Sequence, residues 1–416
     1  MSTPDSSPPQ CIDYVKASPP VPGNTLCRRM VFAVLGLIER DFLQIQTPEG
    51  NCYGFGSRSG ELRAQMTVHH RRAWRRICLG ADLGFAESYL RGEWDTDNLA
   101  ELLHIFARIN RPARRPFPAA ALFKKLARTI HLLQGNSLAG SRRNIAFHYD
   151  LGNDFYGLWL DPGMTYSCAR FADDGSEDLQ AAQSRKHEHI CQLAGLNPAS
   201  EVLEIGCGWG SFARHASQAH GCKVHGLTLS RPQLEHARAC AGKSGAAEQM
   251  QFSLQDYRDS RGQFDAVISI EMFEAVGERH WPKFFATIRD RLKPGASAVL
   301  QIITIDDARF ERYRREVDFI QRYVFPGGCL IGPQVLREQV AAAGFAIASE
   351  EFFAADYVKT LAIWQRAFAA NWPAISQLGF DERFRRMWNY YLSYCQAGFA
   401  SGLINVGTFK LVRKES

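Results

Sequence analysis

The feature that most constrains the fold is a glycine-rich turn between a short apolar run and a helical pattern, in residues 201–216 (EVLEIGCGWGSFARHA). Gly206, Gly208 and Gly210 allow positive φ angles and let a ligand lie against the main chain, and the helix that follows presents free N–H groups. The stretch therefore predicts a strand–turn–helix unit that binds a ligand. Its G-x-G-x-G spacing is shorter than the dinucleotide pattern G-x-G-x-x-G, and a plain tight turn is the alternative.

Apolar runs and helical patterns alternate along the rest of the chain, which predicts right-handed βαβ crossovers and a doubly wound, Rossmann-like α/β sheet of about seven strands. The expected strands lie at residues 203–205, 223–229, 252–259, 264–270, 297–305, 345–354 and 405–412. Ligands bind at the carboxyl ends of such strands. Besides the glycine turn, the residues expected to converge there are Thr228, Gln233, Asp256, Tyr257, Glu271 and Glu274.

With 416 residues, the chain is longer than one core usually organises, so we expect a large domain and a smaller one. Shifts in composition divide it into a Ser- and Pro-rich disordered lead (1–25), a smaller α+β module (26–112), a basic linker or amphipathic segment (113–145) and a large α/β domain (146–416). In the module, alternating runs between Phe42 and Val68 predict a β-meander. Helices are expected after it, at 71–79, 83–91 and 98–109.

The basic segment mixes arginines and lysines with aromatic and aliphatic residues. Such a stretch can lie on an anionic membrane surface or can be a linker helix that packs on a neighbour. Nucleic acid is not expected as a partner, because the aromatics are not spaced as a stacking platform. The chain has no run of 18 apolar residues, which favours a soluble or peripheral protein. Its eleven cysteines form no C-x-x-C pairs, which favours free thiols in the cytoplasm and neither a disulfide framework nor a metal site.

Residues 147–171 are dense in aromatics and contain the turns DLGND and DPGM. They form either a lid over the site or a helix that packs on the sheet. Residues 179–193 predict an amphipathic helix that ends near Gly195. Helical insertions that cover the site are therefore part of the predicted fold.

A series of motifs, in order, resembles the cyclopropane-fatty-acyl-phospholipid synthase family from about residue 83 to the C-terminus. The motifs are HYDLGNDFY, YSCARF, VLEIGCGWGSFA, GLTLS, DYRD, EMFEAVG, FPGGCL and ERFRRMWNYYLSYCQAGF. Members of this family carry the class I methyltransferase fold and transfer a carbon from S-adenosylmethionine across a cis double bond of an unsaturated acyl chain in a membrane phospholipid. The resemblance implies that residues 146–416 are the catalytic domain of such an enzyme, peripheral on the inner face of the membrane, and it is compatible with a homodimer.

The chemistry explains which residues such a site needs. An alkene is a weak nucleophile, so it must be held close to the sulfonium, and the cation formed on the chain must be kept from water among aromatic faces. A base then removes a proton. The resemblance implies that a bicarbonate ion is this base, held by Cys168, Glu274 and Tyr323, with Gln301 at the position of a histidine that helps to hold it. It also implies that Cys395 lines the acyl pocket.

The resemblance likewise assigns the residues that hold S-adenosylmethionine. Tyr166 and Ser167 close over its methionine end, and the strand and turn after Val202 hold the methionine and ribose. The full cofactor set is Tyr166, Ser167, Val202, Glu204, Gly206, Gly208, Gly210, Thr228, Leu229, Ser230, Gln233, Asp256, Tyr257 and Arg258.

Two positions depart from the family pattern. Well-known members read GMFEHVG and LLHTIG where this chain reads EMFEAVG and VLQII, so Ala275 and Gln301 replace histidines. A glutamine offers an amide but does not titrate. A methyltransferase that leaves a methyl or methylene branch is therefore an alternative to ring formation. A non-catalytic lipid- or cofactor-binding relative and a methyltransferase for small soluble molecules are further alternatives, and Cys168 and Cys395 can also be plain buried side chains.

Overall fold

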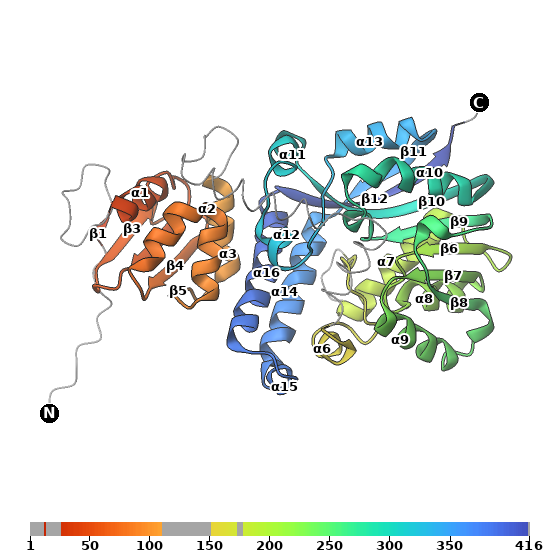
Figure 1. Ribbon diagram of the computed structural model, residues 1–416, viewed down its shortest axis with the longest axis horizontal. Coiled ribbons are helices and arrows are strands. Elements are labelled where there is room, and N and C mark those ends of the chain that lie inside the picture. The colour runs from red at the N-terminus through yellow and green to blue at the C-terminus, as the bar shows by residue number, and fades with distance from the viewer. Residues whose placement is uncertain (1–11, 14–25, 110–150, 173–177, 415–416) are drawn as a thin grey trace. The chain divides into compact units, whose positions relative to one another are not determined.

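The computed structural model describes residues 12–13, 26–109, 151–172 and 178–414. The chain forms two compact units, which are described separately: unit 1 comprises residues 1–127 and 381–401, and unit 2 comprises residues 128–380 and 402–416 (Figure 1). Of the predicted disordered lead, only Ile12–Asp13 falls within the described residues. The basic segment 113–145 lies wholly outside them.

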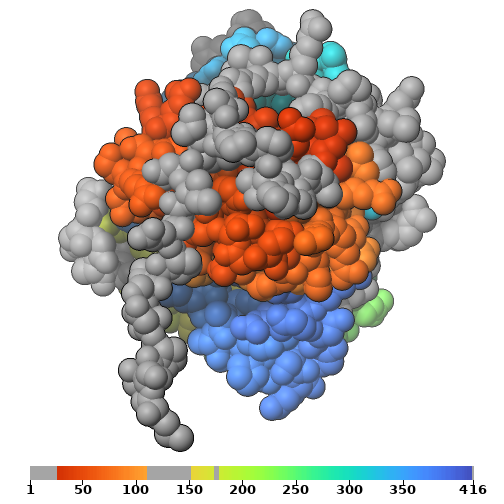
Figure 2. Space-filling model, turned by 90° about the vertical axis from the view of Figure 1, so that its left-hand side faces the viewer, coloured from red at the N-terminus to blue at the C-terminus, as the bar shows by residue number. Residues whose placement is uncertain are grey.

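Unit 1 is built on a five-stranded sheet of order β1-β3-β2-β4-β5. The strands are β1 (Ile12–Asp13), β2 (Phe42–Gln46), β3 (Cys52–Gly56), β4 (Arg63–Val68) and β5 (Trp94–Asp95). The helices are α1 (Leu26–Leu35), α2 (Arg72–Leu90), α3 (Leu99–Ile109) and α16 (Glu382–Ala400). The N-terminal part of this unit is coloured red to orange in Figure 2.

The predicted β-meander is wrong in its connectivity. Strands β2 and β3 form an antiparallel hairpin, but β4 pairs with β2 in parallel rather than with β3. The chain that connects β3 to β4 passes close to Asp41, at the start of β2. The carbonyl oxygen of Asp41 accepts a hydrogen bond from Ser57 N–H at 3.0 Å. Gly56 has φ +84°, and a Cβ there would lie 2.1 Å from the same oxygen, so only glycine allows this crossing.

The two helices predicted at 71–79 and 83–91 are the two halves of α2. Ala81, with φ 47° and ψ −128°, breaks the helical geometry between them, next to Gly80. A glycine inside a helical pattern weakens it, which is why the break could be placed from the sequence. The third predicted helix corresponds to α3.

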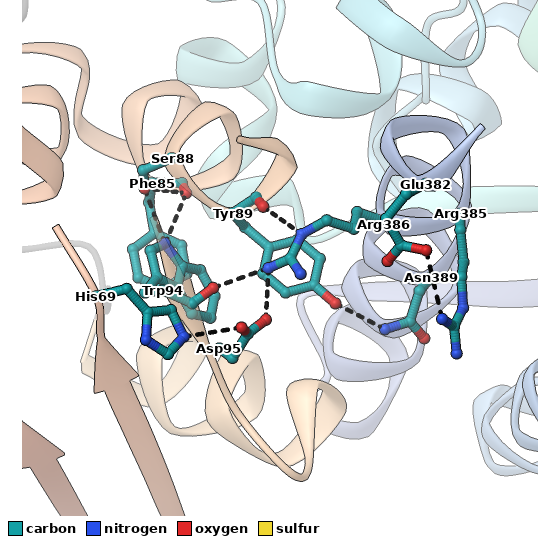
Figure 3. Close-up of polar contacts among 10 residues, drawn as sticks. All are labelled: His69, Phe85, Ser88, Tyr89, Trp94, Asp95, Glu382, Arg385, Arg386 and Asn389. Atoms are coloured by element: carbon teal, nitrogen blue, oxygen red, sulfur yellow. Dashed lines mark hydrogen bonds and ion pairs between the residues drawn. The ribbon is translucent and has the colours of Figure 1, made fainter. Parts of the chain in front are cut away.

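Helix α16 belongs to unit 1, although the sequence placed it in the catalytic domain. The Arg386 guanidinium donates to the carbonyl oxygens of Tyr89 (2.6 Å) and Trp94 (2.8 Å) and to Asp95 Oδ1 at 2.5 Å (Figure 3). It also lies 4.2 Å from the centre of the Tyr89 ring. Asn389 Nδ2 donates to the Tyr89 hydroxyl at 3.0 Å. These contacts join segments that are about 300 residues apart in the sequence.

Unit 2 contains a seven-stranded sheet of order β11-β12-β10-β9-β6-β7-β8, which confirms the predicted fold class. The strands are β6 (Glu201–Ile205), β7 (Lys223–Thr228), β8 (Met250–Leu254), β9 (Phe264–Ile270), β10 (Leu292–Ile305), β11 (Phe345–Phe352) and β12 (Ile404–Arg413). Strand β12 pairs antiparallel with β10 and with β11, and the other pairs are parallel. The order reverses at β6, so the ends of β6 and β9 form the switch point.

Helices cover both faces of this sheet (Figure 1). The principal ones are α7 (Leu179–Ala194), α8 (Ser211–His220), α9 (Arg231–Gly242), α10 (Trp281–Arg291) and α13 (Pro333–Ala342). The shorter or later ones are α6 (Asn153–Gly157), α11 (Asp307–Tyr313), α12 (Phe319–Tyr323), α14 (Ala354–Ala370) and α15 (Trp372–Gln377). Alternate residues of a strand point to opposite faces. Val202 accordingly packs in a core with α7, α8 and α9, whereas Leu203 packs in a second core with α10 and α13.

The expectations about membrane-spanning helices and about the cysteines can also be compared with the structure. Among the described residues, none of the helices has both the length and the apolar character needed to cross a bilayer. Nine cysteines are free, as expected, but Cys52 is disulfide-bonded, which corrects the expectation that all thiols are free. Scattered spacing in the sequence does not reveal which cysteines meet in space.

Candidate active site

The glycine turn follows β6 and has the geometry that the sequence predicts. Gly206, Gly208 and Gly210 have φ angles of +84°, +52° and +81°. A Cβ at Gly206 would lie 2.5 Å from Cγ of Met272, whereas a Cβ at Gly208 would meet nothing within 4 Å. The main chain at the centre of the turn is therefore open to a ligand, and α8 begins directly after it.

The end of β7 brings together a compact polar group. Thr228 Oγ1 donates to Gln233 Oε1 at 2.8 Å and accepts from Ser230 N–H at 3.1 Å. Ser230 caps α9, and its side chain accepts from Gln233 N–H in the first turn of that helix. Leu229, the residue between them in sequence, is half-buried. These are neutral side chains, as the sequence analysis expects for this part of the site.

Beyond β8, Asp256 and Arg258 form a pair. Asp256 is 1% exposed, and its carboxylate accepts from Arg258 Nε at 2.8 Å and from a terminal guanidinium nitrogen at 2.7 Å. The guanidinium carbon lies 5.6 Å from the centre of the Tyr257 ring. Burial raises the pKa of Tyr257 to about 12, so its hydroxyl stays protonated.

Two buried ionisable groups, one acidic and one basic, lie beside the turn. Glu204 is 3% exposed, and its Oε2 has no hydrogen-bond partner among the described residues. Burial raises the pKa of Glu204 to about 8. Lys186 of α7 is completely buried and donates to Ser167 Oγ at 2.6 Å, and burial lowers its pKa to about 8 although neighbouring carboxylates oppose this. The sequence analysis missed Lys186, whose place in a helical pattern carried no signal of its role.

Glu271, just after β9, accepts hydrogen bonds on both of its carboxylate oxygens. Its Oε1 accepts from the Cys168 main-chain N–H at 2.8 Å and from Gln301 Nε2 at 2.7 Å. Its Oε2 accepts from the Tyr357 hydroxyl at 2.6 Å. Burial raises the pKa of Glu271, and these three donors oppose the rise. The residue adopts φ +47°, which is unusual outside glycine and is typical of functional sites.

Glu274 lies one turn further along the same loop. Its Oε1 accepts from Ile303 N–H at 2.5 Å, and its Oε2 is buried without a partner among the described residues. Burial, and then the charge of Glu271, raise the pKa of Glu274 to about 8. At neutral pH, Glu274 is therefore mainly the neutral acid beside a second carboxyl group.

The remaining predicted residues fall in different places. The Cys168 thiol is fully buried and faces the carbonyl oxygen of Ala169 at 3.2 Å, and burial raises its pKa well above the usual value, so it does not act as a thiolate. Tyr323 ends α12, with its ring centre 5.3 Å from that of Phe319. Cys395 lies in α16, which belongs to unit 1. The side chain of Val202 contributes to a hydrophobic core, which leaves its main chain for a ligand.

An aromatic cluster links the glycine turn to Glu271. The Tyr156 ring lies 5.0 Å from Trp209 in the turn and 5.5 Å from Tyr166. The Tyr166 ring lies 5.3 Å from Trp364, and Trp364 lies 6.2 Å from Tyr357. Segment 151–172 therefore packs against α14, and the sequence analysis had left this segment open between a lid and a packed helix. It did not single out Trp364 or Tyr357.

A cavity of about 480 Å³ opens beside this cluster. It is lined by Asn153, Asp154, Gly157, Leu158, Met164, His236, Ala374 and Leu378. Asn153 connects it to the turn, because its Oδ1 accepts from Trp209 Nε1 at 2.7 Å. Neither Cys168 nor Glu274 lines this cavity.

Known proteins share both the sequence and the fold of this chain. Residues 136–409 match the family described as mycolic acid cyclopropane synthetase. The tuberculostearic acid methyltransferase of Mycobacterium tuberculosis is 36% identical over 384 residues, which cover 87% of each chain. The cyclopropane-fatty-acyl-phospholipid synthase of Escherichia coli K12 is 32% identical over 371 residues, which cover 86% of this chain and 92% of the relative.

The solved structures agree with these matches. A mycolic acid cyclopropane synthase in complex with SAH and CTAB superposes with a TM-score of 0.61 at 31% identity, over 66% of this chain and 98% of that one. It shares the methyltransferase sheet that unit 2 contains. From its motifs, its sheet and these relatives, the chain belongs to the mycolic acid cyclopropane synthetase family of S-adenosylmethionine-dependent methyltransferases.

Proposed function

We propose that this enzyme transfers a one-carbon unit from S-adenosylmethionine to the double bond of an unsaturated acyl chain in a membrane phospholipid, and that Glu271 is the base. The observation that carries the proposal is the Glu271 carboxylate, which three donors hold at the end of β9 beside an aromatic cluster. The E. coli relative, named a cyclopropane-fatty-acyl-phospholipid synthase, supports the substrate class.

The residues at the turn fit S-adenosylmethionine. The open main chain at Gly208 gives room for the ligand, and the unpaired oxygen of Glu204 fits a ligand that is cationic at its sulfonium and ammonium groups. Thr228, Gln233 and Tyr257 offer polar groups and a ring for the ribose and adenine. When bound, the cofactor supplies an electrophilic methyl carbon.

The aromatic cluster suits a reaction that passes through a cation on the acyl chain. Trp159, Trp364 and Tyr156 are each at most 1% exposed, so this part of the site excludes water. Aromatic faces stabilise a nearby positive charge by about 0.5–2 kcal/mol each when desolvated. A dry aromatic wall therefore both protects the cation from water and lowers its energy.

Glu271 is placed to act as the base in place of bicarbonate. The resemblance assigns bicarbonate to a site made by Cys168, Glu274 and Tyr323, with Gln301 at the position of a histidine that helps to hold it. Of these residues, Cys168 donates its main-chain N–H, and Gln301 its Nε2, to Glu271 Oε1. A carboxylate group resembles a bicarbonate ion in shape, because each carries two oxygens in one plane with the carbon that bears them. Well-known members have glycine where this chain has Glu271, so the chain carries its own carboxylate at the position where they would bind an anion.

The proton balance is simple. The π electrons of the alkene would form the new bond to the methyl carbon as the bond from that carbon to the sulfonium sulfur breaks and S-adenosylhomocysteine leaves. A C–H bond would then break and pass its proton to Glu271. If the proton leaves the added methyl group, the remaining electron pair closes a cyclopropane ring. If it leaves the chain, the product is methyl-branched and keeps a double bond.

The branched product is the second candidate. The relative that is 36% identical over most of both chains is named a tuberculostearic acid methyltransferase. Ala275 and Gln301 also replace the histidines of ring-forming members, so this chain differs from them next to the base. Both candidates use the same cofactor, the same substrate class and the same carboxylate.

The test is the lipid product. Purified enzyme, S-adenosylmethionine and vesicles of a monounsaturated phosphatidylglycerol should yield S-adenosylhomocysteine and a phospholipid heavier by one methylene group. Resistance of the product to ozonolysis identifies the ring, and cleavage identifies the branched alkene. Vesicles of the matching saturated lipid are the control and should give no turnover. Equal turnover on saturated vesicles, or none on unsaturated vesicles with folded enzyme that binds the cofactor, contradicts the proposal.

Peripheral binding to the inner membrane surface is the corresponding proposal for location. The basic segment 113–145 that suggested it lies outside the described residues. Co-sedimentation of the full chain with anionic and with neutral vesicles tests it, and equal binding to both would contradict an electrostatic attachment.

A further inference from the structure

Four potential metal ligands meet between two helices of unit 2, outside the candidate active site. Glu188 and Cys191 are three residues apart on α7 and so share one face of it, and His215 lies at the middle and His220 at the end of α8. The Cys191 Sγ and one ring nitrogen from each histidine all lie within 4.8 Å of one another. No short-range motif brings them together, so the sequence spacing did not indicate a metal site.

Glu188 completes the group from the solvent side. Its Oε2 lies 3.2 Å from His215 Nε2 and 2.9 Å from His220 Nε2. The side chains of His215, His220 and Glu188 are 21%, 19% and 37% exposed, whereas Cys191 is fully buried. The group therefore has a buried thiol at its base and an opening through which an ion can enter.

We propose that Glu188, Cys191, His215 and His220 bind one Zn²⁺ ion. One thiolate, two imidazoles and one carboxylate form a four-coordinate donor set that zinc favours. In a tetrahedral zinc site the donor atoms are about 3.3–3.8 Å apart, so side-chain rotations bring the present positions to that geometry. On binding, the sulfur–zinc bond replaces the S–H bond of Cys191, and the proton goes to solvent.

The position indicates a structural role. Helix α7 also carries Lys186, which donates to Ser167, and α8 starts directly after Gly210. An ion held by both helices would fix the cofactor turn relative to the buried lysine. It would touch neither cofactor nor substrate, so the inference does not rest on the proposed reaction.

The test measures metal binding and stability rather than activity. Untagged, chelator-treated enzyme is titrated with ZnCl₂ by calorimetry, and its melting temperature is measured with and without zinc. We expect one ion per chain and a higher melting temperature with zinc. Cobalt should give the visible absorption of a tetrahedral site with a thiolate-to-metal charge-transfer band. No binding by folded wild-type enzyme overturns the proposal and leaves the four residues as an ordinary ion-pair cluster.

Variants identify the ligands. Cys191→Ser should remove the charge-transfer band, and Cys191→Ser and His220→Asn should each weaken zinc binding by at least about tenfold. Glu188→Gln keeps a polar side chain at the solvent edge and gives a milder variant if the others fail to fold. His225→Gln is the control, because His225 packs against Phe264 away from the group and should leave binding unchanged. Cys222→Ser should keep the band, and loss of the band there but not in Cys191→Ser would overturn the assignment.

Discussion

The two units treat buried acids in opposite ways. In unit 1, Glu93 is completely buried, and its carboxylate meets Arg72 Nε at 3.0 Å and Arg76 at 3.0 and 3.2 Å. In unit 2, Glu204 and Glu274 each keep a buried oxygen without a partner among the described residues, and burial raises the pKa of each to about 8. An acid whose charge two arginines balance, such as Glu93, serves structure, whereas an acid with such an oxygen, or one held by neutral donors as Glu271 is, is available for a ligand or a proton.

The largest effect should come from Glu271. Replacing it with glutamine (Glu271→Gln) removes the base and keeps the shape, so kcat on unsaturated vesicles should fall by about 10²- to 10⁴-fold. Affinity for S-adenosylmethionine, measured by calorimetry, should persist. Glu311→Gln is the control, because Glu311 is an exposed acid of the same unit and should leave kcat unchanged. Undiminished turnover in Glu271→Gln would remove this residue from the chemistry.

The paired acid of unit 1 should behave in the reverse manner. Glu93→Gln leaves Arg72 and Arg76 without their shared carboxylate, and the free energy of unfolding should fall by about 3 kcal/mol. Cofactor affinity should not change. Urea denaturation measures the first quantity and calorimetry the second, with the exposed Glu39→Gln as control. A Glu93→Gln protein with an unchanged free energy of unfolding that fails to bind the cofactor would contradict the structural role of Glu93.

Glu274 should make the free energy of unfolding depend on pH. Burial and the charge of Glu271 raise the pKa of Glu274 from 4.5 to about 8, so the folded protein binds a proton that the unfolded chain has lost. The stability that this group contributes is fully present below pH 4.5 and is lost as the pH rises to about 8. Glu274→Gln should flatten this part of the profile, measured by urea denaturation at several pH values. An unchanged slope would show that Glu274 ionises normally.

A smaller effect should follow from removing one donor to the base. Tyr357→Phe deletes the hydroxyl that lies 2.6 Å from Glu271 Oε2. One hydrogen bond to a charged group is worth about 1.5–3 kcal/mol, so kcat should fall about tenfold or more and the pH profile of kcat should shift to higher pH. A loss of activity with no shift in the profile would mean that Tyr357 only shapes the pocket.

The smallest expected effect is a change in the free energy of unfolding from a contact within unit 1. Asn389→Ala removes the neutral hydrogen bond that Asn389 donates to the Tyr89 hydroxyl (Figure 3), and the free energy of unfolding should fall by about 1 kcal/mol with no change in kcat. Arg386, with three acceptors, is the stronger contact of the same helix. A larger loss for Asn389→Ala than for Arg386→Gln would contradict this ranking.

The parts of the fold that depend on local sequence pattern could be predicted from the sequence. Strands β6, β7 and β9 were predicted within about two residues, because apolar runs and glycine turns mark them directly. The group formed by Thr228, Ser230 and Gln233 was also predicted together, because these residues follow one another between the end of β7 and the start of α9.

The features that could not be predicted from the sequence depend on contacts between distant segments. The parallel pairing of β4 with β2 and the place of α16 in unit 1 rest on Asp41 and Arg386, whose partners lie far away in the sequence. Lys186 and Tyr357 looked like ordinary residues of amphipathic helices, and only the folded chain brings them to Ser167 and Glu271. The departures noted from the sequence were Ala275 and Gln301, and the bonding of Glu271 is seen only in the folded chain.

The most direct test of the central claim is the initial rate of lipid alkylation in buffer freed of carbon dioxide, with and without added bicarbonate. If Glu271 is the resident base, the rate should be the same in both conditions, and only Glu271→Gln should lose it. A rate that vanishes without bicarbonate and returns when bicarbonate is added would contradict the account.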